Sequence, residues 1–312
     1  MKLCLSIEIQ EGLDYQGTLA LARAGEAAGF DAALLAEHYA SSAGSADVSA
    51  PEAWVFLGGL AVDTERIRLG TLVSPVTFRP PSVLAKLAAT LDNLSAGRAE
   101  LGIGAGWLEA EHTAYGLPFP EPPQRVDLLE EQLQVIKGLW THERFSHAGR
   151  AYKLQDCRFT PMPVQKPHPT LIVGGRPASR RILRLAARYA DEYVISLPTP
   201  EDCRTVRALL DHRCALSAFT YACVAPTAAE SDRRLAALTT SLRPAMRDTS
   251  RWIVGTPDRA RDQLGKLEAA GISRLFVAAW DELHLELPSL LLSAVAASPG
   301  DGSACLDRSG RP

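Results

Sequence analysis

The sequence lacks the features that mark several classes of protein. Its apolar runs fall short of the roughly 20 residues that a membrane-spanning helix needs, and the first run is interrupted at Glu8. A secretory signal would need a longer apolar stretch and a small-residue cleavage site, so we expect a cytoplasmic protein. The formal net charge of −3 gives no electrostatic basis for binding nucleic acid or an anionic membrane.

Metal and disulfide signatures are also missing. The six cysteines are scattered and form no Cys-x-x-Cys pair, which is typical of free thiols in a reducing compartment. No His-x-His or His-Glu-x-x-His spacing occurs, so a metal-dependent hydrolase would lack its ligands. We therefore predict no metal site.

What is present is a regular alternation of short apolar segments with helical patterns. Each apolar segment is nearly continuous, as expected for strands buried on both faces, and each precedes a helix. The predicted strands are residues 3–9, 32–36, 67–73, 99–103, 170–173, 192–196, 219–224 and 274–278. Eight such units predict an α/β fold, a (β/α)8 TIM barrel, with an open doubly wound sheet as the alternative.

One segment interrupts this alternation after the fourth helix. Residues 141–168 carry short aromatic stretches, a turn and several prolines, so we predict an insertion that forms a hairpin over one end of the barrel. Residues 1–297 are then one domain, and residues 298–312 are a disordered tail.

Active sites of such barrels lie at the carboxyl ends of the strands. That rule selects Glu37, His38 and Tyr39 after the second strand, and mostly small residues elsewhere. The others are Thr71, Leu72, Val73 and Ser74 at the third strand, Gly104, Ala105 and Gly106 at the fourth, and Gly174 and Gly175 at the fifth. Glycine here would let the backbone approach a flat ring closely. No lysine occupies a strand end, which disfavours a Schiff-base enzyme.

Several of these residues have two interpretations. One segment leads from Gly174 through Arg176 and Ser179 into a helix. It is either a phosphate-binding site or an ordinary turn followed by a solvated basic face. His38 is either catalytic or merely hydrogen-bonded to its neighbours. Trp107 either packs in the core or lines a cofactor pocket. We place Glu111 in a solvated turn.

Three longer runs then resemble the luciferase-like monooxygenase family. They are LGTLVSPV at 69–76, PSVLAK at 81–86 and LSAGRAELGIGAGW at 94–107. EAEH at 109–112, followed by YGLP at 115–118, looks like the family's branch that uses the deazaflavin coenzyme F420. LAARYADE at 185–192 and VGTP at 254–257 fit as well, so the resemblance covers about residues 1–280.

The resemblance implies a barrel that holds a flavin or deazaflavin ring in its mouth and commonly forms a homodimer. A non-proline cis peptide would fall within residues 72–74, and the cofactor phosphate would lie near Gly175, Arg176 and Ser179. Two differences from the family pattern limit what the resemblance implies for this chain. Trp107 replaces the acid of the sugar-phosphate dehydrogenases, so sugar-phosphate oxidation is disfavoured, and Val194 replaces an asparagine common in relatives.

Our leading hypothesis is an F420-dependent oxidoreductase. The reduced deazaflavin would pass a hydride to a C=C, C=N or C=O group of a small organic substrate. His38 would donate the proton, with Glu37 orienting it and Trp107 shaping the pocket. The alternatives are an FMN-dependent monooxygenase that uses O2 and a partner flavin reductase, and a barrel that binds flavin without turnover. A flavin or F420 reductase is accordingly the expected protein partner.

Overall fold

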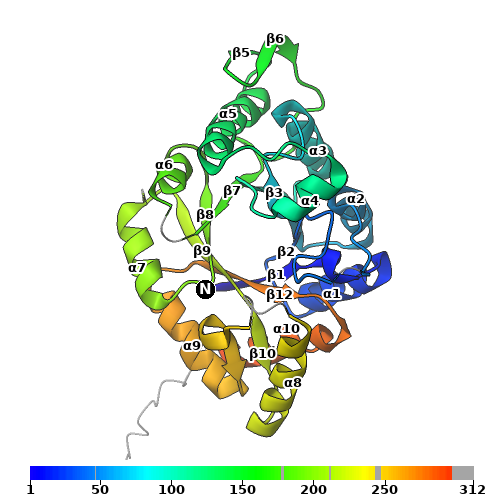
Figure 1. The fold of residues 1–312 in the computed structure, drawn as a ribbon, viewed down its shortest axis with the longest axis vertical. Coiled ribbons are helices and arrows are strands. Elements are labelled where there is room, and N and C mark those ends of the chain that lie inside the picture. The colour runs from blue at the N-terminus through cyan, green and yellow to red at the C-terminus, as the bar shows by residue number, and fades with distance from the viewer. Residues whose placement is uncertain (46, 177–178, 211, 243–246, 297–312) are drawn as a thin grey trace, which may run out of the picture.

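The computed structural model describes residues 1–45, 47–176, 179–210, 212–242 and 247–296. Eight parallel strands close into a barrel in the order β1-β12-β9-β8-β7-β4-β3-β2 (Figure 1). They are β1 (Lys2–Ile7), β2 (Ala32–Leu35), β3 (Arg68–Pro75), β4 (Ala99–Gly104), β7 (Thr170–Gly175), β8 (Glu192–Ser196), β9 (Ala215–Thr220) and β12 (Arg274–Ala279). Because β1 pairs with both β12 and β2, the sheet has no edge. The predicted TIM barrel is confirmed.

Helices surround the ring of strands (Figure 1). They are α1 (Tyr15–Ala27), α2 (Ala53–Asp63), α3 (Pro81–Leu94), α4 (Glu109–Tyr115), α5 (Pro122–Thr141), α6 (Arg180–Tyr189), α7 (Pro200–Leu209), α8 (Ala228–Ser241), α9 (Pro257–Ala269) and α10 (Leu287–Ala296). Their starts follow ordinary capping rules. Proline occupies the first turn of α3, α5, α7 and α9, and Thr199 and Asp202 form a capping box on α7.

The seventh barrel strand differs from the prediction. We expected it at residues 219–224, but the barrel uses β9, and the next residues form β10 (Ala222–Val224), which pairs with β11 (Ile253–Gly255) outside the ring. Helix α7 ends at Leu209, which leaves Ala215 free to begin the strand. A single apolar run from 215 to 224 therefore serves two sheets.

The predicted hairpin is formed by β5 (Arg144–Ala148) and β6 (Lys153–Arg158). It lies against the outside of α5 rather than over the mouth (Figure 1). Glu131 on α5 fixes it by accepting hydrogen bonds from the Ala151 and Tyr152 amides. The predicted tail, residues 298–312, lies outside the described residues.

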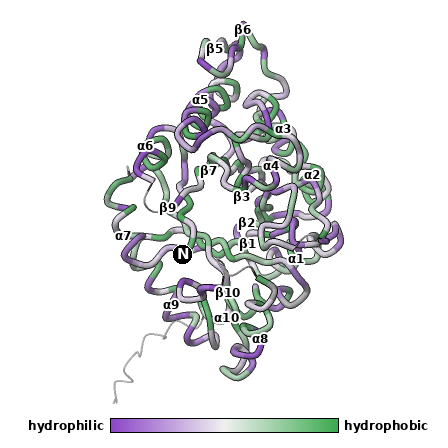
Figure 2. The backbone as a smooth tube through the Cα atoms, viewed as in Figure 1, coloured by the Kyte–Doolittle hydropathy of each residue, from purple (hydrophilic) through white to green (hydrophobic). Residues whose placement is uncertain are grey.

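Inward side chains fill the barrel in layers, and Figure 2 shows hydrophobic residues along its strands and hydrophilic ones recurring on the outer helices. The middle layer is apolar and consists of Cys4, Ala32, Leu34, Ile172, Val194 and Phe276. The layer at the amino ends of the strands is charged: Arg274 pairs there with Glu100 and Glu192, all buried. This plug closes one end of the barrel, which leaves the opposite end for a site.

Candidate functional site

The carboxyl ends of the strands carry an inward row of side chains, because every second residue of a strand faces the barrel axis. Contacts along the strands support this alternation: Ser6 donates to Glu8 at 2.8 Å, and the Phe219 and Tyr221 rings lie 5.4 Å apart. The row consists of Glu8, His38, Leu72, Gly104, Gly174, Ser196, Tyr221 and Trp280. Small residues occupy its β4, β7 and β8 side, and large or titratable ones the other side.

His38 stands at the end of β2 with its ring held by Glu111. Its Nδ1 lies 3.0 Å from Glu111 Oε1, and the same carboxylate accepts the Tyr39 amide at 2.9 Å. Glu111 is 1% exposed, whereas His38 is only half-buried. We expected Glu111 in a solvated turn, and that expectation was wrong because residues 109–115 form α4, which turns Glu111 inward. A carboxylate on one ring nitrogen fixes the orientation of a histidine.

Glu37 does not contact His38 in the way that we expected. Its carboxylate accepts hydrogen bonds from Arg79, Ser74 and Trp54, and Arg79 also reaches Glu52 and the Tyr39 hydroxyl. Burial raises the pKa of the Glu37 carboxyl, and Arg79 and Ser74 oppose that rise. The predicted orienting role therefore falls to Glu111, and Glu37 instead ties β2 to β3 and α2.

Glu8 is a buried carboxyl that the sequence did not single out. It accepts hydrogen bonds from Ser6 and from Gln10, whose amide nitrogen lies 2.9 Å away, but no arginine or lysine pairs with it in the described part of the chain. Burial raises its pKa, which the hydrogen bonds and the charge of nearby His38 only partly offset. An acid of this kind keeps its proton to higher pH than an ordinary glutamate.

Trp107 follows β4 and is 52% exposed, so it is not a core residue. Its ring meets His38 edge to face with the centroids 5.6 Å apart. Behind it, the fully buried His112 anchors α4 through Thr77 and the Leu108 carbonyl. The structure therefore brings His38, Glu111 and Trp107 together at the mouth.

The residues at the ends of β3 and β4 pack against one another. The Leu72–Val73 peptide is cis, at the position that the family resemblance implies. The Val73 side chain lies beside β4 and β7: a Cβ added to Gly104 or Gly174 would come within 2.7 or 2.9 Å of its methyl groups. We expected these glycines to leave room for a flat ring, but their immediate role is to accommodate Val73. Thr71 and Ser74 are buried and hydrogen-bonded to each other.

The predicted phosphate-binding site lies after β7. Gly174, Gly175 and Ser179 are half-buried and Arg176 is exposed. Ser179 occupies the N-cap position of α6, yet its hydroxyl makes no capping hydrogen bond. An N-cap hydroxyl that does not satisfy the helix leaves donors for an anion.

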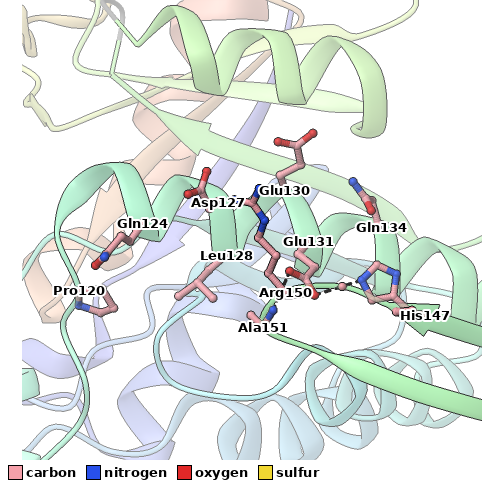
Figure 3. A pocket seen from close by; sticks show the side chains of 12 residues that line it. Pro120, Gln124, Asp127, Leu128, Glu130, Glu131, Gln134, His147, Arg150 and Ala151 are labelled. Atoms are coloured by element: carbon pink, nitrogen blue, oxygen red, sulfur yellow. Dashed lines mark hydrogen bonds and ion pairs between the residues drawn. The ribbon is translucent and has the colours of Figure 1, made fainter.

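A hollow of about 560 Å³ lies elsewhere, between α5 and the β5–β6 hairpin (Figure 3). Glu131 in its wall is already engaged by two amides and His147, and these hydrogen bonds hold the pKa of Glu131 below its usual value despite burial. We assign this groove a structural role. Within the described residues, no His, Cys, Asp and Glu side chains gather as a metal-ligand set.

The rule about strand ends would have found Glu8 and Trp280 had it been applied to the first and eighth strands. Each stands one residue beyond the end of its observed strand, Glu8 after β1 and Trp280 after β12. Tyr221 was hidden because the seventh strand was placed too late in the chain.

The chain belongs to the luciferase-like monooxygenase family, whose model matches residues 2–274. It is 30% identical over 187 residues to an FMNH2-dependent dimethylsulfone monooxygenase of Pseudomonas putida, a match that covers 60% of this chain and 50% of the relative. It is 38% identical over 170 residues to an F420-dependent glucose-6-phosphate dehydrogenase of Kineococcus radiotolerans, covering 54% and 49%. The matched region thus spans about half the length of these curated relatives.

Solved structures share the fold at low sequence identity. An F420-dependent secondary alcohol dehydrogenase superimposes with a TM-score of 0.79 at 16% identity, covering 94% of this chain and 98% of that one. A monooxygenase from Streptomyces bottropensis gives 0.79 at 21% identity, covering 95% and 99%. These solved structures show that the chain shares their fold. No helix in the described residues is long and apolar enough to cross a bilayer.

Proposed function

We propose that the protein is an F420-dependent oxidoreductase that transfers a hydride between the deazaflavin and a C=C, C=N or C=O group of a small organic substrate. The observation that carries this proposal is the His38–Glu111 pair at the mouth, beside the buried acid Glu8. A hydride transfer to such a group needs one matching proton, and this pair is built to handle one.

The residues present fit such a cofactor. The β4, β7 and β8 side of the inward row carries only Gly104, Gly174 and Ser196, with the Val73 side chain of β3 against the two glycines, so a planar ring would rest there. Gly175, Arg176 and the uncapped Ser179 hydroxyl at the start of α6 would hold a phosphate. When bound, the cofactor supplies the hydride chemistry.

The polypeptide then handles the proton. Glu111 engages Nδ1 of His38, which leaves Nε2 to exchange a proton with the substrate. Burial raises the pKa of Glu8, so it holds a proton to higher pH than an ordinary glutamate and can pass that proton to His38 from the neighbouring strand end. Trp107 packs on the His38 ring and excludes water from that side.

Binding titrations with oxidised F420 and with FMN, followed by the fluorescence of each cofactor, test the proposal. We expect saturable F420 binding that is at least about tenfold tighter than FMN binding. Tight FMN binding without affinity for F420 would overturn it and favour the second candidate, an FMN-dependent monooxygenase that uses O2 and a partner reductase. The similarity to the dimethylsulfone monooxygenase supports that candidate.

We also propose that the protein is a homodimer that pairs through α2. Val55 and Val62 on this helix are 72% and 74% exposed, and an apolar patch on an outer helix is typical of a subunit interface. Val55→Asp should shift the elution volume in size-exclusion chromatography from dimer to monomer. A wild-type protein that elutes as a monomer would overturn this assignment.

A further inference from the structure

We infer that the substrate is a planar, uncharged ring compound that lies between His38 and an aromatic platform made by Tyr221 and Trp280. This inference rests on the proposed function, because it places the acceptor group of the substrate within reach of the His38 proton. It narrows the small organic substrate to one chemical class.

The platform belongs to the inward row. Trp280 directly follows β12, and a hydrogen bond of 2.8 Å from the Glu8 amide to the Ala279 carbonyl sets it beside the end of β1. Tyr221 directly follows β9, the neighbour of β12 in the ring. Their rings meet edge to face at 5.8 Å, and both side chains are only half-buried, so part of each ring remains accessible.

Both rings are held from behind. Trp280 packs on the buried His284 at 4.3 Å, and His284 in turn bonds Asp281 at 2.5 Å. Tyr221 packs on the buried Trp252 at 4.7 Å. Because these rings are positioned before a ligand arrives, stacking on them costs little ordering entropy.

The charges on this side disfavour an anionic substrate. The row from Tyr221 through Trp280 and Glu8 to His38 contains no lysine or arginine among the described residues. Arg251 is engaged by the Leu197 carbonyl and Asp202. The carboxyl groups of Glu8 and Glu111 offer a phosphate no cationic partner.

A comparison of two ketones of equal carbon number tests the inference. The dissociation constants of acetophenone and 2-octanone, and of glucose 6-phosphate as the anionic probe, are measured by calorimetry on the whole protein with and without oxidised F420. Offset or edge-to-face ring contacts predict that acetophenone binds about three- to tenfold tighter than 2-octanone. Equal affinity, tighter binding of 2-octanone or of glucose 6-phosphate, or no binding of either ketone would overturn the inference.

Two variants test whether the aromatic platform causes the preference for acetophenone over 2-octanone. Trp280→Leu should reduce the preference for acetophenone to less than about twofold, whereas Trp280→Phe should retain most of it. An unchanged preference in Trp280→Leu would overturn the assignment, and if that variant does not fold, the ketone comparison on the wild type still decides. A ketone preference without F420 binding would defeat the cofactor proposal alone, and F420 binding without a preference would defeat the substrate class alone.

Discussion

Both ends of this barrel contain buried carboxyl groups, but the partners of these groups differ between the two ends. At the amino ends of the strands, Arg274 lies 3.0 Å from Glu100 and 2.8 Å from Glu192. At the carboxyl ends, Glu8 has no cationic partner among the described residues other than His38, and Glu111 is bonded to His38 and a backbone amide. Arginine stays charged at any ordinary pH and histidine does not. The amino end is therefore a permanent ion-pair plug, and the carboxyl end is equipped to gain and lose protons.

The largest expected effect comes from removing the titratable partner at the mouth. His38→Ala should lower turnover about 100- to 10,000-fold while the affinity for the cofactor changes little, because positioned acid–base groups contribute that much to rate. Turnover is measured with the first compound found to reoxidise the reduced cofactor. His142→Ala, at the end of α5, is the matched control and should leave the rate unchanged. A full rate in His38→Ala would remove its catalytic role.

At the opposite end the same kind of substitution should affect folding. Arg274→Met leaves the buried Glu192 without its arginine and leaves Glu100 paired with Arg68 alone, so we expect the free energy of unfolding to fall by about 3–5 kcal/mol. Urea unfolding measures the change. Arg144→Met, which breaks an exposed pair with Asp156 on the hairpin, should cost less than about 1 kcal/mol. Equal losses in the two variants would contradict the view that the plug is structural.

The two ends also differ in how far the sequence predicted them. Alternation of apolar strands and helices was enough to predict the barrel and to place His38 and Trp107 at its mouth. It did not reveal that Glu111 faces inward, because α4 is only seven residues long and its burial depends on the position of β2. The glycines were equally ambiguous: that Gly104 and Gly174 make room for Val73 depends on contacts between three strands. The Arg274 plug joins residues up to 174 positions apart, which no local pattern contains.

The smallest expected effect is a pH dependence of stability that comes from Glu8. Burial raises the pKa of Glu8 in the folded protein, so the protonated form is favoured there, and the stability that it contributes is lost as the pH rises through that raised pKa. Glutamine cannot ionise and keeps a hydrogen-bonding side chain. Between about pH 5 and pH 8, the wild type should therefore lose about 1 kcal/mol of unfolding free energy relative to Glu8→Gln.

Urea unfolding of both proteins across this pH range measures the difference, with Glu109→Gln as the control because Glu109 is exposed at the start of α4. Parallel curves for wild type and Glu8→Gln would show that Glu8 ionises in the folded protein as readily as in the unfolded chain, and it could then not replenish His38. Curves that diverge with pH would mean that the buried Glu8 lowers the free energy of unfolding when it ionises. The carboxylates of the plug at the other end avoid this loss because they are paired with arginine. Such a cost is expected where a barrel keeps a group for chemistry rather than for folding.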